Sequence, residues 1–213
     1  MADPTDRLRL VQWLSPAFPI GAFAYSQGLE VAISDGDIRT AADLEAWIAA
    51  ILRHGSGRID AVLLAHARKP QADLARLTDL ILALAPSAER VTELQEQGRA
   101  FALAINAITG ADHPARPYPI AVGAATASLN VSTTEVLTLS LQGLAVQLTS
   151  AAVRFVPLGQ TDGQRVLANL APRITTLAAE YAHAPLSALH SSAIRADIAA
   201  MRHETLPVRI FRT

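Results

Sequence analysis

The sequence predicts an all-α protein, with a single domain of about eight to ten helices around a central buried helix at about 133–155. Apolar residues recur at spacings of three and four along most of the chain, which is the period of one buried helix face. No stretch alternates apolar and polar residues for long enough to indicate a strand. No linker is long enough to divide the 213 residues, so we expect 1–213 to form one unit.

The N-terminal segment 10–30 is apolar but cannot form one continuous helix. Pro16 and Pro19 interrupt any helix, while Phe18 and Phe23 have large apolar side chains. A loop with so many apolar residues must pack, either against its own core or against another protein.

The end of this segment has the features of a short helix. We expect that helix to begin at Tyr25 and to include Glu30. Ser26 is a suitable N-cap, and Gly28 would leave one side of the helix thin.

Two amphipathic helices follow. Thr40 is placed as an N-cap with Asp43 three residues later, and the helix after it has a regular apolar face: Leu44, Trp47, Ile48, Ile51 and Leu52. The second helix has a stripe of the same spacing: Val91, Leu94, Gly98, Phe101, Ile105 and Ile108. Glycine costs a helix about 1 kcal/mol relative to alanine, so Gly98 indicates a close helix–helix approach.

The central helix begins with a capping-box pattern, Ser132 to Glu135. No charged residue occurs between Glu135 and Arg154, and apolar residues form two seams along this stretch. A helix that is apolar on two faces is covered on two sides, which places it at the centre of the fold. Its Thr, Ser and Gln residues are too numerous for a bilayer core, so we expect no membrane span. Pro157 should end the helix at the preceding residue.

Further helices are predicted at about 161–171, 173–183 and 187–202, with Pro185 before the last of them. The chain then ends in the segment 203–213, which we predict to be an extended docking tail. Chain ends are usually polar, but this one is amphipathic and contains the run Val-Arg-Ile-Phe-Arg.

Composition excludes several functions. The chain has no cysteine, which excludes disulfides and thiolate metal sites. Its net charge of −1 makes nucleic acid an improbable partner. No nucleotide-binding or hydrolase motif is present, and no two of the six histidines lie three or four residues apart. We therefore predict no catalytic residue, no metal site and no cofactor. Without an export signal, a cytoplasmic location is expected.

Three stretches carry a family resemblance: WLSPAFPIGAFAYSQGLE at 13–30, VRFVPLGQTDGQRVL at 153–167 and MRHETLPVRIFR at 201–212. They closely resemble the UreF family of urease accessory proteins, and they occur in the family's order along the whole chain. The segment YPIAVG at 118–123 resembles a fourth family motif.

The resemblance implies an all-helical, non-enzymatic scaffold for the maturation of nickel urease. Such a scaffold binds UreD, which is called UreH in some species, and forms a homodimer. It recruits the GTPase UreG, which carries nickel, and presents it to the urease apoprotein. The resemblance places partner contacts in three groups: Tyr25, Ser26, Gly28 and Glu30; Arg154, Gln160 and Asp162; Arg209, Phe211 and Arg212.

Two other functions stay open at this point. A direct nickel carrier would bind nickel tightly as an isolated chain. A ligand-binding helical domain would need convergent polar groups in an apolar pocket, and the sequence identifies no such group.

Overall fold

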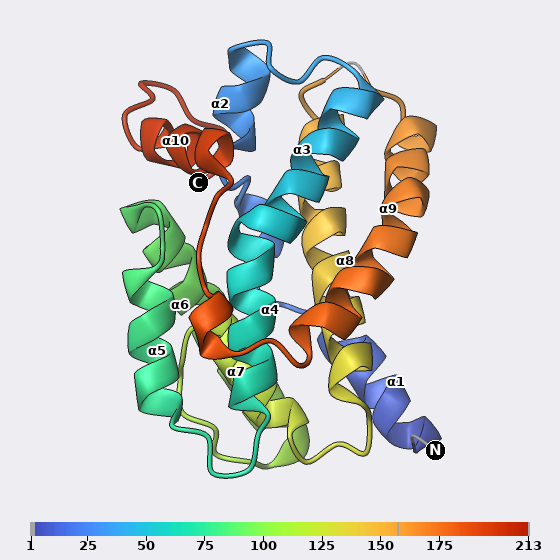
Figure 1. The fold of residues 1–213 in the computed structure, drawn as a ribbon, viewed down its shortest axis with the longest axis vertical. Coiled ribbons are helices and arrows are strands. Elements are labelled where there is room, and N and C mark those ends of the chain that lie inside the picture. The colour runs from blue at the N-terminus through green and yellow to red at the C-terminus, as the bar shows by residue number, and fades with distance from the viewer. Residues whose placement is uncertain (1–2, 157, 213) are drawn as a thin grey trace.

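The computed structural model describes residues 3–156 and 158–212. Within those ranges the protein contains ten α-helices, two short 3₁₀ helices and no strand (Figure 1), so the predicted all-α class is confirmed. The elements are α1 (Pro4–Trp13), η1 (Ala22–Ala24), α2 (Leu29–Ser34), α3 (Ala41–His54), α4 (Ser56–Ala67), α5 (Leu74–Ala83), α6 (Ala88–Thr109), α7 (Tyr118–Thr126), α8 (Thr133–Val153), α9 (Gln160–Tyr181), η2 (Leu186–Ala188) and α10 (Ile194–His203).

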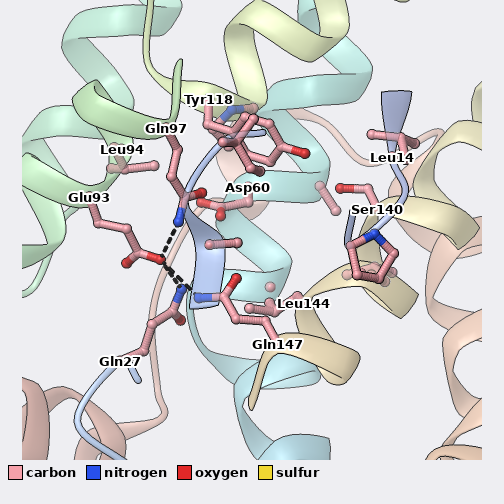
Figure 2. Close-up of a pocket in the computed structure, with 18 of the residues that line it drawn as sticks. Leu14, Gln27, Asp60, Glu93, Leu94, Gln97, Tyr118, Ser140, Leu144 and Gln147 are labelled. Carbon is pink, nitrogen blue, oxygen red and sulfur yellow. Dashed lines mark hydrogen bonds between the residues drawn. The ribbon is translucent and has the colours of Figure 1, made fainter. Parts of the chain in front are cut away.

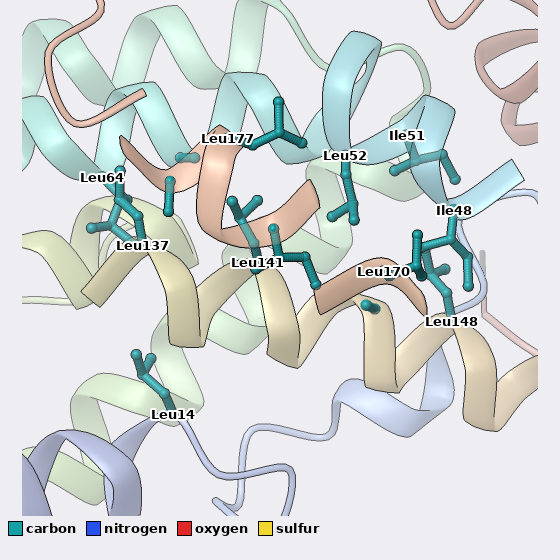
Figure 3. Packing of buried hydrophobic residues seen from close by; sticks show 14 of the residues in the cluster. Leu14, Ile48, Ile51, Leu52, Leu64, Leu137, Leu141, Leu148, Leu170 and Leu177 are labelled. Carbon is teal, nitrogen blue, oxygen red and sulfur yellow. The ribbon is translucent and has the colours of Figure 1, made fainter. Parts of the chain in front are cut away.

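Helix α8 is the central helix, as predicted. It packs most extensively against α9 and also contacts α2, α3 and α4. Figure 3 shows Leu141 and Leu148 among leucine and isoleucine side chains of α3 and α9, while Leu14 approaches α8 from the other side. By length and composition α8 could cross a membrane, but half of its apolar window is buried inside the protein. It is therefore a core helix.

The central helix ends at Val153, earlier than the expected boundary. The N–H groups of Arg154 and Phe155 donate to the carbonyls of Ala151 and Ala152, three residues back. This tighter turn ends α8, although the N–H of Val156 still donates to the carbonyl of Ala152, four residues back. Pro157, which the sequence predicts to end the helix, lies outside the described residues.

Helix α3 begins as predicted, because the side chains and backbones of Thr40 and Asp43 form a reciprocal capping box. Helix α6 differs from the prediction at Ile108, which is 54% exposed and does not belong to the core. A Cβ on Gly98 would overlap the backbone of Arg116 and lie 2.8 Å from the backbone N of Tyr118, the first residue of α7. The predicted close approach is therefore to the start of α7 and the segment before it.

The predicted break near 172 is wrong, since α9 is one helix that contains Pro172. Proline removes one helical hydrogen bond and costs about 3 kcal/mol in a helix interior. Leu170 and Ile174 are buried on either side of it, and this burial holds both halves against the core. Figure 1 shows that α9 changes direction along its length, as expected for a helix with an internal proline.

The last helix begins at Ile194 and not near 187. Residues 186–188 form only one 3₁₀ turn. The N–H groups of Ser192 and Ala193 then donate to the carbonyl of His54 at the end of α3. These bonds hold the chain in a non-helical path until α10 starts.

Candidate functional site

The segment before α2 is held by the core and by α10. Tyr25 is 2% exposed, and Nε2 of Gln147 on α8 donates to its carbonyl at 3.1 Å. Gly28 has a φ of 78°, a left-handed conformation that favours glycine. A Cβ at this position would overlap the backbone of Ala200. Glycine is therefore required both by the turn and by the approach of α10.

The predicted helix from Tyr25 is wrong, because α2 begins at Leu29 with Gly28 as its N-cap. Ser26 is fully buried, and its Oγ accepts a long bond of 3.4 Å from the N–H of Glu30. Ser26 therefore supports the first turn of α2 without occupying the N-cap position.

The side chain of Glu30 holds the C-terminal tail (205–212). The tail was expected to begin at 203, but His203 is the last residue of α10, and residue 213 lies outside the described residues. Its carboxylate is 5% exposed and accepts the N–H groups of Ile210 and Phe211, each at 3.0 Å. Oε2 is also 3.1 Å from Nε2 of His203. Burial by itself would raise the pKa of Glu30, but the Phe211 N–H, His203 and the Ile210 N–H together lower it. The buried carboxylate is thus kept ionised by the segment that it binds.

The tail docks onto its own chain. Phe211 is 5% exposed, and its ring centroid lies 5.2 Å from that of Phe155, directly after α8. Nη1 of Arg209 donates to Oε1 of Glu89 at 2.5 Å. Val208 and Ile210 point outward and are 78% and 71% exposed. The tail therefore has one docked face and one apolar face open to solvent.

Tyr25, Glu96 and Arg212 meet at the edge of the docked tail. The Tyr25 hydroxyl donates to Oε2 of Glu96 at 2.5 Å, and Arg212 forms a two-bond ion pair with the same carboxylate. The guanidinium also lies 5.6 Å from the centre of the Tyr25 ring. Burial, and then the bond to Glu96, raise the pKa of Tyr25, so its hydroxyl stays protonated and donates. The bonds from Tyr25 and Arg212 lower the pKa of Glu96.

The second predicted group, which contains Arg154, Gln160 and Asp162, lies around the turn between α8 and α9. Arg154 is the exposed C-cap of α8, and its side chain forms no ion pair with the residues that the structure describes. Asp162 caps α9 through the N–H of Gly159 and pairs with Arg165 at 2.8 Å, and Gln160 is exposed at the first position of α9. The contact between Phe155 and Phe211 connects this turn to the tail.

A buried polar cluster, which the sequence analysis did not identify, lies beneath the N-terminal segment (Figure 2). Oε1 of Glu93 accepts bonds from the amide nitrogens of three glutamines, at 3.0 to 3.3 Å: Gln27, Gln97 and Gln147. Arg90 lies between Glu93 and Asp60, at 2.6 and 2.5 Å. Its contact with Oε2 of Glu93 is an ion pair without hydrogen-bond alignment.

Burial raises the pKa of Asp60, against the opposing effect of Arg90. Arg90, Glu93 and Gln97 recur at helical spacing on α6. This polar stripe is the sequence feature from which the buried cluster could have been predicted. The cluster borders a cavity of about 60 Å³, comparable to the space of one or two water molecules. In residues 3–156 and 158–212, no group of three or more His, Asp or Glu side chains is arranged to hold a metal ion.

Comparison with known proteins gives one consistent family. The family model described as UreF matches residues 38–171. The urease accessory protein UreF of Cereibacter sphaeroides is 60% identical over 206 residues, which covers 97% of this chain and 98% of the relative. The UreF proteins of a Jannaschia species and of Paracoccus denitrificans are each 49% identical, with 97% of this chain covered and 94% and 96% of the relatives. The chain therefore belongs to the UreF family, whose members are non-catalytic urease accessory proteins that act in urease maturation with the partners of the urease accessory complex.

Proposed function

We propose that this chain is a scaffold that binds UreD (UreH), recruits the GTPase UreG and presents its nickel to the urease apoprotein. The scaffold acts in the cytoplasm as a homodimer. One observation supports this proposal most strongly: the three predicted groups of partner residues are neighbours in the fold. Tyr25 contacts Arg212, Glu30 binds the backbone of the tail, and Phe211 contacts the residue after Arg154.

Exposed apolar side chains support a role in protein binding. On α10, Ile194, Ile198 and Met201 are 66%, 49% and 49% exposed, and their spacing of four and three places them on one face of the helix. The outward side chains of the tail extend the apolar surface of this region. Apolar surface of this kind marks contacts with other proteins.

The first test is co-expression with the cognate UreD and UreG, followed by measurement of the size and mass of whatever purifies together. A stable complex that contains UreD supports the scaffold. A chain that ignores both proteins contradicts it. Nickel titration of the isolated chain separates the carrier alternative, because tight stoichiometric binding by the chain alone would favour a carrier.

Two variants test whether Tyr25 and Arg154 contribute to UreG recruitment. Tyr25→Phe removes the buried hydroxyl that donates to Glu96 and contacts Arg212, so the edge of the docked tail loses a support. We expect UreG recruitment to weaken while UreD remains bound. Arg154→Ala removes an exposed cation next to the tail, and we expect the same loss. Arg173→Ala is the matched control, since Arg173 is also an exposed arginine, on α9. If the Arg154 and Arg173 variants recruit UreG equally well, Arg154 is not part of the UreG-binding site.

A further inference from the structure

Two residues other than glycine have a positive φ in the part of the chain that the structure describes, and both are glutamines. Gln27, with a φ of 52°, precedes α2 and is only 8% exposed. Gln71, with a φ of 58°, lies at an exposed position between α4 and α5. The left-handed region is unfavourable for a residue with a Cβ, so the surroundings of the buried Gln27 must hold it in this conformation.

Gln27 and Gly28 are the central residues of a tight turn. The N–H of Leu29 donates to the carbonyl of Ser26 at 3.1 Å, and both central residues have a positive φ, which is the pattern of a type I′ turn. Such turns favour Asn-Gly, because asparagine enters the left-handed region more readily than other residues with a Cβ. Glutamine does not share this preference. The local sequence therefore does not account for the turn by itself.

The side chain of Gln27 supplies the missing support. Its Nε2 atom donates to Oε1 of Glu93 on α6 at 3.2 Å (Figure 2), and its Oε1 atom accepts the hydroxyl of Ser56, the first residue of α4, at 2.8 Å. Two helices thus hold the two ends of one amide group. An asparagine amide is one methylene shorter and would not reach both partners from the same backbone position.

The turn lies between two parts of the partner-binding surface. Tyr25 comes two residues before Gln27, and α2, which carries Glu30, begins two residues after it. We propose that Gln27 is a positioning residue of this surface. Its amide fixes the turn, and the turn holds Tyr25 and Glu30 where they contact the C-terminal tail. Support of the turn is a property of the isolated chain, whereas the consequence for UreG recruitment rests on the proposed function.

Gln27→Asn separates the support from the turn in the isolated full-length chain. The substitution favours the left-handed conformation but shortens the amide, and Glu93 keeps two other glutamine donors, so the chain should fold. We expect the N–H of Leu29 to exchange with solvent roughly tenfold faster, the effect of one or two lost hydrogen bonds, while exchange in α8 stays slow. Gln71→Asn is the matched control, since it makes the same chemical change at an exposed left-handed position.

Two outcomes of this measurement would overturn the proposal. Unchanged or slower exchange at Leu29 in Gln27→Asn would mean that the turn holds itself without the two bonds. Equal acceleration at Leu29 and throughout α8 would mean that the variant loosens the whole protein and does not act on the turn.

Ser56→Ala tests the same support from the other side, because it removes the hydroxyl that Gln27 accepts and leaves the sequence of the turn intact. We expect faster exchange at Leu29, by a smaller factor than in Gln27→Asn. The double variant should exchange no faster than Gln27→Asn alone, because both changes break the same contact. Fully additive effects would assign the two residues separate roles and contradict the proposal.

The last measurement is the affinity of UreG for the complex of the full-length chain with UreD. We expect UreG to bind Gln27→Asn roughly fivefold more weakly, as when a contributing interface contact is displaced, while UreD binding and the midpoint of urea unfolding stay unchanged. A merely structural residue would not give this combination. Equal UreG affinity for Gln27→Asn and the unsubstituted chain would overturn the positioning role. If the unsubstituted chain binds no UreG, the proposed function fails instead, and hydrogen exchange alone decides whether Gln27 holds the turn.

Discussion

Glu93 and Glu30 are both buried carboxylates, 0% and 5% exposed, but different parts of the chain hold them. In the described part of the chain, the contacts found for Glu93 are with side chains of α6, α8 and the segment before α2. Glu30 is bound by His203 and by backbone N–H groups from the last residues of the chain. The first arrangement joins helices that cannot separate without unfolding. The second holds a non-helical tail, so we expect its loss to leave the helices packed.

The largest effect is expected at the Glu93 cluster. Glu93→Leu removes one of the two carboxylates that pair with buried Arg90 and the acceptor that three glutamine amides share. Breaking a buried ion pair by removing one partner costs about 3 to 5 kcal/mol. Urea denaturation should show this loss as a shift of the whole unfolding transition. Gln95→Leu, at an exposed position of α6, is the control and should leave the transition nearly unchanged. If Glu93→Leu affected only the tail, Glu93 would not join the helices, and the contrast with Glu30 would be wrong.

Phe211→Ala should have the next largest effect, and its effect should be local. Replacing a buried phenylalanine by alanine costs about 3 to 5 kcal/mol, and less where the surroundings can collapse into the space. Phe211 is the tail residue that joins the main hydrophobic core, so we expect this free energy to appear first as tail opening. Amide hydrogen exchange should speed up over 205–212 and stay slow in α8. Val208→Ala, on the exposed face of the same tail, should leave exchange unchanged. Faster exchange in α8 would mean that the tail is an integral part of the core.

Glu30→Gln should have a smaller effect. The amide oxygen can still accept one N–H, so we expect a loss of about 1 to 2 kcal/mol in tail docking. The lowered pKa of Glu30 sets the sign on the acid side: its contribution is present above the ordinary carboxyl value and is lost as the pH falls through the lowered pKa. Tail docking should therefore weaken in acid. Glu30→Gln should remove this acid dependence of tail docking. Asp79→Asn, at an exposed position, should leave the acid dependence unchanged. An unchanged acid dependence in Glu30→Gln would contradict the role of Glu30.

The smallest effect on stability is expected at Arg154. Its exposed side chain has no ion pair in the described part of the chain, so Arg154→Ala should change the free energy of unfolding by less than about 0.5 kcal/mol. The same variant should reduce UreG recruitment under the proposed function. A large loss of stability would show that the residue is structural.

The helical periodicity of the sequence predicted the all-α class and the long helices α3, α6 and α8, because each of these has an apolar stripe and a side-chain N-cap. It did not place α1, α4, α5 or α7 individually. The prediction failed at Pro172. Proline usually ends a helix, but burial of Leu170 and Ile174 on either side of it keeps α9 continuous.

The periodicity also missed the polar clusters, because their members are far apart in the chain. His203 and Glu30 are 173 positions apart, and Tyr25 and Glu96 are 71 apart. Only the packing of α10 on α2, and of the N-terminal segment on α6, brings these groups into contact.

Gln147 shows how chemical ageing could affect this protein. One amide nitrogen of this side chain donates to the carbonyl of Tyr25 at 3.1 Å and to the carboxylate of Glu93 at 3.3 Å. Deamidation would keep the size and shape of the side chain but replace the shared donor with an acceptor that faces two acceptors. A change of one atom would then disturb the buried cluster and the Tyr25 surface together, although the two regions are built from different parts of the sequence.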